Sequence, residues 1–384
     1  MERHIVHIDV NSFAVSVERV VDARLRDRPV IVSYPAMDRA VVQSTSLEAR
    51  QAGIYRGMLL QKALRLCRDV TVIPPNEPLY SRAMRAMMNI VSQFTPITEP
   101  NDYGHAYLDI TGTRRLFGIT TDTAIKIQQE ILSRLRLPTS LGVAGNKMVS
   151  KIASEVSAPG GVQEVEWGAE RQFIAPLKIH HLPWISQPVK KQLLDLNIRI
   201  IEQISSLSIP HLTMIFGRTG LKLHRAANGI DNTPVWPPQQ LPNLYEQHTL
   251  AEDSNDVNVL RSALYQLTEN AGRRLRATRQ TTRKLVLEIY YADHREACGQ
   301  RRLPAATQAD GELFLAVDEL FKKILTRRIR VRKLALRFFQ LTPVSAQLSL
   351  FDQTPQSTKV ALTQAMDRIR DRFGDDAVRF SFVK

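Results

Sequence analysis

The chain has few cysteines and no long apolar run. Only two of its 384 residues are cysteine, Cys67 and Cys298, and they stand far apart with no CxxC or Cys/His spacing. We therefore expect neither a disulfide framework nor a zinc site. The N-terminus lacks the basic segment, apolar core and small-residue cleavage site of a secretory signal, and no stretch approaches the length of a membrane span. These absences predict a cytoplasmic protein with no membrane partner.

Acidic residues are also in deficit. Lys plus Arg number 52 against 38 for Asp plus Glu, which gives a formal charge of +14 and a pI of about 10.0. Such a charge favours a polyanionic partner, with nucleic acid as the first candidate and an anionic membrane as the second. The hydrophobic content of 43% is enough for a sizeable core, so a disordered protein is excluded.

Strand and helix patterns alternate in the first part of the chain. Apolar or β-branched runs predict strands at Ile5 to Val10, His105 to Ile110 and Ser140 to Ala144. Helical patterns at Ser44 to Ala52 and Gln61 to Cys67 predict a small helical insertion between the first two strands. The alternation favours an α/β core.

Two breaker-rich segments divide the rest of the chain. The sequence APGG at residues 158–161 precedes a helical stretch, which predicts a second domain. Four prolines within residues 234–242 precede strand patterns at Lys284 to Tyr291 and Arg332 to Leu341, with helices between them. This third domain is expected to be of the α+β class. An amphipathic helix is predicted at Thr358 to Phe373.

Six segments, in order along the chain, resemble motifs of Y-family (DinB/UmuC-type) DNA polymerases. They are IDVNSF at residues 8–13, SLEAR at 46–50, AYLDIT at 106–111, LGVAGNKMVSKIA at 141–153, FGRTGLKLHRAANGIDNTPV at 216–235 and a strand at 283–293. The resemblance implies the right-hand fold of that family, α/β and α+β multidomain. Its parts are a palm at residues 1–165 with helical fingers inserted at about 25–75, a helical thumb at 166–233, an α+β little finger at 243–342 and a tail at 343–384.

The family's chemistry needs carboxylates that hold Mg²⁺. The resemblance implies a metal site made of Asp9, the backbone of Val10 and an Asp-Glu pair just before AYLD, but the last two positions are Gly104 and His105. Glycine offers no ligand, and imidazole suits softer transition metals better than Mg²⁺. Asp9 is therefore either a vestigial catalytic ligand or an acid that caps the next helix, and His105 is either a packed histidine or a ligand.

The nucleotide contacts that the resemblance implies are also incomplete. They fall on Phe13, Ala14 and Arg50, and Ala14 stands where the family has the aromatic that screens the sugar 2′ position. Leu47 and Ala158 occupy the positions of a triphosphate-binding Tyr and Lys. Arg50 either binds phosphate or is an ordinary solvated charge. This pattern resembles ImuB-type proteins, Y-family relatives that act as clamp-bound adaptors for another mutagenic polymerase.

Two basic runs in the third domain predict DNA phosphate contacts, with a solvated charged face as the plainer interpretation. The predicted DNA-binding residues are Arg273, Arg274, Arg276, Arg283, Lys284, Arg327, Arg328, Arg330 and Arg332. In the thumb, Trp184 and Ser186 stand where the family's hairpin has glycines, which predicts weak DNA contact there. In the tail, Gln347, Leu348, Leu350 and Phe351 resemble the peptide that binds the bacterial sliding clamp.

Three hypotheses follow. The first is an adaptor without catalysis that binds damaged or primer-template DNA and the sliding clamp, with another error-prone polymerase and a RecA-like accessory protein as further partners. The second is an active lesion-bypass polymerase that uses Mg²⁺ at a site rebuilt from Asp9 with Asp102 or Glu99. The third is a general basic DNA-binding module. The positions of the carboxylates distinguish the first two hypotheses.

Overall fold

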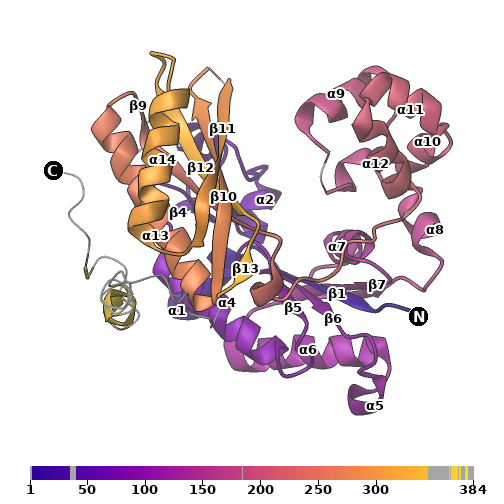
Figure 1. Cartoon of the computed structure of the whole chain (residues 1–384). Helices are drawn as coiled ribbons and strands as arrows, with labels where there is room; N and C mark the ends of the chain where they lie inside the picture. The colour runs from indigo at the N-terminus through magenta and orange to yellow at the C-terminus, as the bar shows by residue number, and fades with distance from the viewer. Residues whose placement is uncertain are drawn as a thin grey trace. The chain divides into compact units, whose positions relative to one another are not determined.

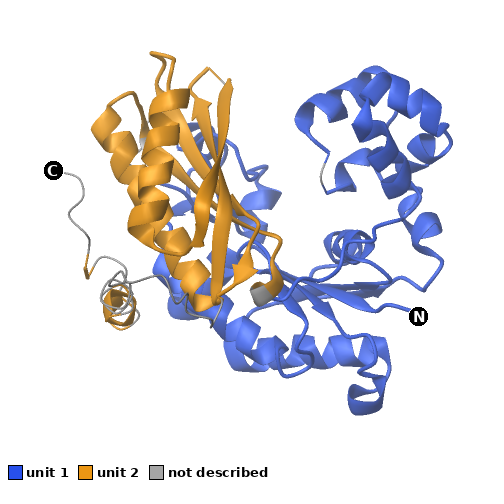
Figure 2. Cartoon of the chain, viewed as in Figure 1, with its two compact units in different colours: residues 1–237 blue, residues 238–384 orange. Residues whose placement is uncertain are grey.

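The computed structural model describes residues 2–34, 40–183, 185–293, 295–344, 363, 365–370, 372 and 377–378. Contacts within the chain divide it into two compact units, unit 1 at Met1–Pro237 and unit 2 at Pro238–Lys384 (Figure 2). Within the described residues, no helix has both the length and the apolar character needed to cross a bilayer.

A five-stranded sheet, which we call the β1 sheet, forms the centre of unit 1. Its strand order is β5-β6-β1-β7-β8. The strands are β1 (Ile5–Val10), β5 (Thr98–Pro100), β6 (His105–Asp109), β7 (Thr139–Ala144) and β8 (Val162–Glu164). Strand β1 runs antiparallel to both β6 and β7. The three strands predicted for this part of the chain are therefore neighbours at the middle of the sheet.

Helices cover both faces of the β1 sheet (Figure 1). They are α1 (Phe13–Val21), α4 (Glu77–Val91), α6 (Thr120–Leu135) and α7 (Lys147–Val156), while the short α5 (Arg114–Phe117) contacts α6. In β1, Val6, Ile8 and Val10 pack into the core that includes side chains of α4 and α6. Side chains alternate along a strand, so His7 and Asp9 point to the opposite face, where α7 packs.

The insertion between β1 and β6 contains a small sheet as well as helices. Its elements are η1 (Ala23–Leu25), β2 (Val30–Val32), β3 (Ser44–Thr45), α2 (Leu47–Gln51), α3 (Leu60–Leu66) and β4 (Thr71–Ile73). The two predicted helices are present, but the three-stranded sheet in the order β3-β2-β4 was not predicted. Strands of two or three residues are too short to show an alternating pattern in the sequence.

The end of unit 1 is helical, as the sequence predicted. Its elements are α8 (Glu170–Ile174), η2 (Ile179–His181), α9 (Gln187–Asp195), α10 (Ile201–Ser205), α11 (Ile209–Phe216) and α12 (Arg218–Ala227). Leu193, Ile204, Leu212 and Leu223 form a common core with apolar residues of α7. Trp184, in the predicted thumb hairpin, lies outside the described residues.

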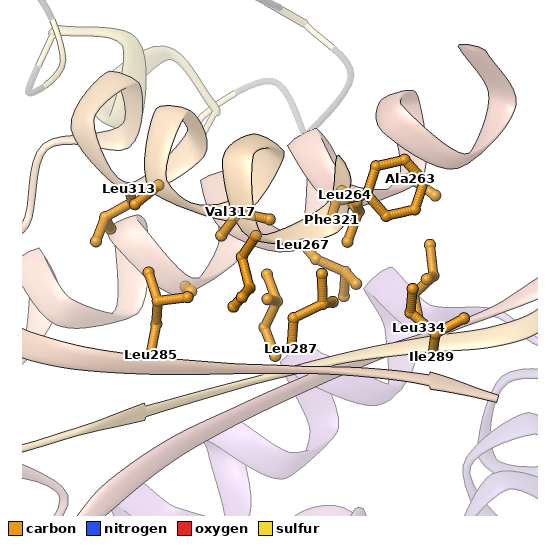
Figure 3. Close-up of a cluster of buried hydrophobic side chains, with 14 of the residues drawn as sticks. Ala263, Leu264, Leu267, Leu285, Leu287, Ile289, Leu313, Val317, Phe321 and Leu334 are labelled. Carbon is orange, nitrogen blue, oxygen red and sulfur yellow. The ribbon is translucent and has the colours of Figure 1, made fainter. Parts of the chain in front are cut away.

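Unit 2 has an α+β fold in which two helices pack on one sheet, which we call the β10 sheet. The elements are η3 (Pro238–Gln240), β9 (Asn243–Ser254), α13 (Val257–Ala277), β10 (Gln280–Tyr291), β11 (Glu296–Thr307), α14 (Asp310–Ile324), β12 (Val331–Phe339) and β13 (Thr342–Pro343). The sheet order is β11-β10-β12-β9. Figure 3 shows Leu267 of α13 and Val317 of α14 directed at Leu285 and Leu287 of β10. One face of the sheet is therefore buried under both helices.

Part of the chain beyond β13 packs against helix α13 of the same unit. Described residues within 365–370 are helical, as predicted for that segment. Asp367 accepts hydrogen bonds from Arg276, and Arg370 forms a buried ion pair with Glu269. The predicted clamp-binding residues Gln347, Leu348, Leu350 and Phe351 lie outside the described residues.

Candidate functional site

Asp9 and His105 lie side by side at one edge of the β1 sheet. They are partners in the β1–β6 register, and His105 Nδ1 lies 3.7 Å from Asp9 Oδ1. Burial raises the pKa of Asp9, although His105, Lys151 and Arg50 act in the opposite direction. Burial also lowers the pKa of His105, against the effect of Asp9. Burial thus acts against the charged form of both groups, and their mutual attraction opposes it.

Gly104, where the resemblance implies an acid, is committed to glycine by its surroundings. Its φ is +84°, and a Cβ placed there would lie 2.7 Å from Phe13 Cβ and 2.9 Å from Phe13 Cγ. The backbone is also fixed, because the Val10 N–H donates to the Gly104 carbonyl oxygen at 2.9 Å. A side chain at this position would require both an unfavourable φ and a displaced Phe13.

Aromatic side chains hold Phe13 in that place. Its ring stacks on Tyr103 with 5.8 Å between centroids and 1° between planes, and it meets the edge of Tyr80 at 6.2 Å. The Tyr80 hydroxyl donates to Glu18, and the Tyr103 hydroxyl shares a hydrogen bond with Ser81. Phe13 is thus part of a packed cluster and not a mobile cover over Gly104.

Glu99 and Asp102, the alternative acids, are not assembled with Asp9. Both carboxylate oxygens of Glu99 accept from Lys147 Nζ at 2.7 Å, and one also accepts the Trp236 N–H at 2.7 Å. Asp102 is exposed in the turn before β6. Across the described ranges, no three His, Cys, Asp or Glu side chains are placed to hold a metal ion. The residues present therefore do not fit the pair of Mg²⁺ ions that the resemblance implies.

Arg50, the surviving nucleotide-contact residue, lies near the same edge. Its Nη2 donates to Ser12 Oγ at 2.5 Å, and Ser12 has a φ of 51° just before α1. Ala14 packs partly into the core beside Phe13, and Leu47 is exposed on α2. The arrangement leaves one basic group near Asp9, where the resemblance implies three triphosphate contacts.

His7 is a buried residue of this face that the sequence analysis did not single out. It is fully buried, and its Nδ1 lies 2.6 Å from Ser154 Oγ. Because the Ser154 hydroxyl donates to the Lys151 carbonyl oxygen, His7 must be the donor to Ser154. Burial, reinforced by His105, Lys151 and Lys147, holds the pKa of His7 well below its usual range. Only its position in an otherwise apolar strand run could have drawn attention to it.

Several predicted DNA-binding arginines are engaged within unit 2. Arg276 is the clearest case, because it is 10% exposed and bridges Asp310 and Asp367 at 2.6 Å each. Three others also have acidic partners: Arg274 with Glu246, Arg327 with Asp293 and Arg332 with Asp253. Arg276 is therefore a poor candidate for binding phosphate, whereas the side chains of Arg274, Arg327 and Arg332 remain partly exposed to solvent. Arg283 donates to the Pro304 carbonyl oxygen, and Lys284 lies over Phe339.

The face of the β10 sheet opposite the helices carries cations that the sequence analysis did not assign to DNA. Arg337 of β12 and Arg302 of β11 lie on it, beside Lys284 and Lys333. The signal was present as alternation in β12, where Lys333, Arg337 and Phe339 alternate with buried Leu334, Leu336 and Phe338.

Family models cover most of the chain. Residues 8–155 match the model described as impB/mucB/samB family, and residues 244–350 match the one described as impB/mucB/samB family C-terminal domain. The two matches contain the Asp9 edge of unit 1 and all of the β10 sheet except Asn243, the first residue of β9.

Individual proteins are similar over almost the full length. A protein named DNA polymerase IV from Desulfatibacillum aliphaticivorans is 33% identical over 380 residues, which cover 98% of this chain and 96% of that protein. Among solved structures, a Y-family DNA polymerase chimera of Dbh and Dpo4 has a TM-score of 0.73 at 22% identity, covering 88% of this chain and 99% of its own. The insertion ternary complex of Dbh DNA polymerase has a TM-score of 0.67 at 22% identity, with the same coverage of both chains. The structures bear out the α/β and α+β multidomain fold.

Proposed function

Because the chain belongs to the impB/mucB/samB family, the DinB/UmuC type of Y-family DNA polymerases, we propose that it acts on DNA in translesion synthesis as an adaptor without catalysis. In this proposal it binds damaged or primer-template DNA and supports another error-prone polymerase. The ternary complex named above supports DNA as the ligand, and the charge of +14 suits a polyanion. The palm, fingers, thumb and little finger at the boundaries given above are part of the same proposal.

One observation carries the absence of catalysis: the fit between Gly104 and Phe13. Polymerase chemistry uses two metal ions held by carboxylates about 3.5–4 Å apart. The missing acid at residue 104 is not simply a changed side chain, since Cβ itself has no room beside Phe13. With His105 as the next residue, Asp9 is the one acid left of three. Each tenfold loss of rate needs only about 1.4 kcal/mol, so a misplaced metal ion is enough to stop synthesis.

The second candidate is an active, low-fidelity lesion-bypass polymerase that uses Mg²⁺. It is favoured by the 33% identity to a protein named DNA polymerase IV over nearly the full length. This function requires Glu99 to leave Lys147 and the Trp236 N–H, or Asp102 to move from its turn to Asp9. The first change breaks contacts that the structure contains, and the second requires the exposed Asp102 side chain to turn towards Asp9.

Primer extension on undamaged and lesion-containing templates separates the two functions. The adaptor proposal predicts DNA binding by the wild-type protein but no steady extension with Mg²⁺, and at most weak addition with Mn²⁺, which accepts imidazole more readily. Asp9→Ala is the matched control, and it should bind DNA as the wild type does. Robust Mg²⁺-dependent synthesis that Asp9→Ala abolishes would overturn the adaptor proposal and support the polymerase.

The clamp-binding peptide belongs to the same proposal. Gln347, Leu348, Leu350 and Phe351 supply an amide and apolar anchors of the kind that enter a hydrophobic pocket. Replacing Leu350 and Phe351 together by alanine should weaken clamp binding by about 2 kcal/mol or more, as loss of buried anchors does. Ser349→Ala is the control and should bind normally. If the double variant binds the clamp as tightly as the wild type in a surface-binding assay, this peptide is not a clamp-binding motif. The RecA-like accessory protein is a separate prediction.

A further inference from the structure

The helical residues 365–370, which we call the tail segment, dock on helix α13 through one side of the segment. Met366 and Arg370 are one helical turn apart and are 5% and 4% exposed, and Asp367 lies beside Met366. Arg368, which points away from this side, is exposed. Only one of the three docked side chains is apolar, so the contact with α13 is mainly ionic.

Two ion pairs fix the position of the tail segment. Asp367 accepts hydrogen bonds from Arg276 Nε at 2.6 Å and from Arg276 Nη2 at 3.0 Å. Arg370 forms a buried ion pair with Glu269, and it also donates to the Val378 carbonyl oxygen at 2.6 Å. The tail segment and α13 each contribute one acid and one arginine. The contact is therefore specific for a segment in which an acid and an arginine are three residues apart.

The docking site on α13 is built around Gly272, in the interior of that helix. A Cβ at Gly272 would overlap Asp310 Oδ1 and lie 3.0 Å from Arg276 Nη1. Asp310, at the start of α14, occupies this space and accepts a hydrogen bond from Arg276 Nη1 at 2.6 Å. A glycine inside a helix is less stable than an alanine, so the space is kept against helix propensity. Arg276 is thus oriented by a partner that does not belong to the tail segment.

The balance of forces favours reversible docking of the tail segment. Removing charged groups from water costs nearly as much free energy as their attraction returns, so buried ion pairs add little net stability. Met366 is the one apolar side chain among the three docked residues. When the segment leaves, Glu269 and Arg370 return to water while Arg276 keeps Asp310 and the Gln308 carbonyl oxygen. Undocking therefore leaves none of these charges both buried and unpaired.

We propose that the tail segment is a reversible latch on α13, set by the Arg276–Asp367 and Glu269–Arg370 pairs, and that its docked state restrains clamp binding. This inference rests on the proposed function in that it takes residues 347–351 as the clamp-binding peptide. The peptide lies in the chain between β13, which pairs with β10, and the tail segment, so docking joins it to unit 2 at both ends. A chain fixed at both ends has fewer conformations, and fewer of them leave room for a partner around it. The apparent clamp affinity is then reduced in proportion to the undocked fraction.

Amide hydrogen exchange of residues 365–370 in the full chain, measured by mass spectrometry, tests the latch. Arg370→Glu places a carboxylate against Glu269, and Asp367→Lys places an ammonium against Arg276, so each should raise exchange by about tenfold or more. Combining Glu269→Arg with Arg370→Glu restores opposite charges and should restore protection. Arg368→Glu is the matched control, because it makes the same charge change at an exposed position of the segment. It should exchange as the wild type does.

Clamp binding by the same full-length variants tests the restraint. In a surface-binding assay, Arg370→Glu should bind the sliding clamp about fivefold more tightly than the wild type, or better. The charge-swapped double variant and Arg368→Glu should both bind as the wild type does, which separates the latch from the change in net charge. Unchanged hydrogen exchange in α13 excludes misfolding of unit 2 as the cause.

The outcomes separate this inference from the function on which it rests. Equal exchange in the wild type, Arg370→Glu and Asp367→Lys overturns the latch. A charge-swapped variant that exchanges as fast as Arg370→Glu overturns the pairing with Glu269. Faster exchange in Arg370→Glu without tighter clamp binding overturns the restraint alone. If neither the wild type nor Arg370→Glu binds the clamp, the restraint falls together with the clamp-binding part of the proposed function, and exchange still decides the latch.

Discussion

Aromatic rings have opposite roles at the Asp9 edge of the β1 sheet and on the face of the β10 sheet that α13 and α14 leave uncovered. At the Asp9 edge, the Phe13 ring fills the space that a side chain at residue 104 would need. On that face of the β10 sheet, the charged group of Lys333 lies over the Tyr290 ring and that of Arg337 lies over the Tyr245 ring. The same class of side chain therefore excludes an acidic side chain in one unit and contacts cations in the other. The comparison predicts a protein that binds DNA without holding the metal ions for synthesis.

The largest effect on stability is expected at Glu99, because its carboxylate forms a buried ion pair with Lys147. Glu99→Gln leaves Lys147 without its carboxylate partner in a site where both side chains are under 15% exposed. Breaking a buried pair of this kind costs about 3–5 kcal/mol of unfolding free energy. All three tryptophans belong to unit 1, so their fluorescence during denaturation reports on that unit.

The control for Glu99 is Glu130→Gln, which breaks the exposed Glu130–Arg134 pair and should cost under about 1 kcal/mol. If Glu99 were a metal ligand, its effect on stability would depend on the metal present. We expect the same loss in EDTA and in Mg²⁺. A Glu99 variant whose stability differs between the two conditions contradicts the structural role.

A smaller loss is expected when Gly104 acquires a Cβ. Gly104→Ala combines an unfavourable φ, about 1–2 kcal/mol, with overpacking against Phe13, about 1–3 kcal/mol. Gly112→Ala is the matched control, because Gly112 has a φ of +81° but open space around its Cβ position. The difference between the two variants measures the steric part. Equal melting temperatures would mean that Phe13 yields, and the position would then accept an acid.

The smallest effect is a pH dependence that comes from His7. Burial keeps folded His7 neutral, whereas in the unfolded chain it takes up a proton below its usual pKa of about 6.5. Protonation therefore stabilises the unfolded state as pH falls. The free energy of unfolding of unit 1 should decrease by up to about 2 kcal/mol between pH 6.5 and 5. His105, whose pKa is also lowered, adds to this loss, while Asp9 opposes it. His7→Phe should flatten the pH dependence, and an unchanged slope would assign it to other groups.

Local sequence patterns predicted the central strands well and the edge strands poorly. The run Ile5–Val10 has buried β-branched residues that no helix pattern matches, and the structure has the predicted strand. Strand β11 (Glu296–Thr307) was not predicted, since it lies at the edge of the sheet and Leu303 is its one buried residue. Its conformation comes from pairing with β10, which is a tertiary effect that alternation does not reveal.

At the candidate site, the sequence identified the missing acids but not why they are missing. Residue types alone showed glycine and histidine at residues 104 and 105. The positive φ of Gly104 and the approach of Phe13 depend on how α1 packs against the turn before β6, which spacing cannot reveal. The burial of Arg276 likewise depends on Asp367, which is 91 residues away in the chain.

Nucleotide-dependent retention on DNA tests the central claim most directly, because it reports on the metal and nucleotide site without requiring turnover. The measurement is the dissociation rate of the wild-type protein from a labelled primer-template with Mg²⁺, with either the complementary or a mismatched nucleoside triphosphate. We predict the same dissociation rate in both cases, and the same rate for Asp9→Ala. Slower dissociation with the complementary nucleotide alone, lost in Asp9→Ala, would show that the Asp9 edge assembles a working metal site and would contradict the account.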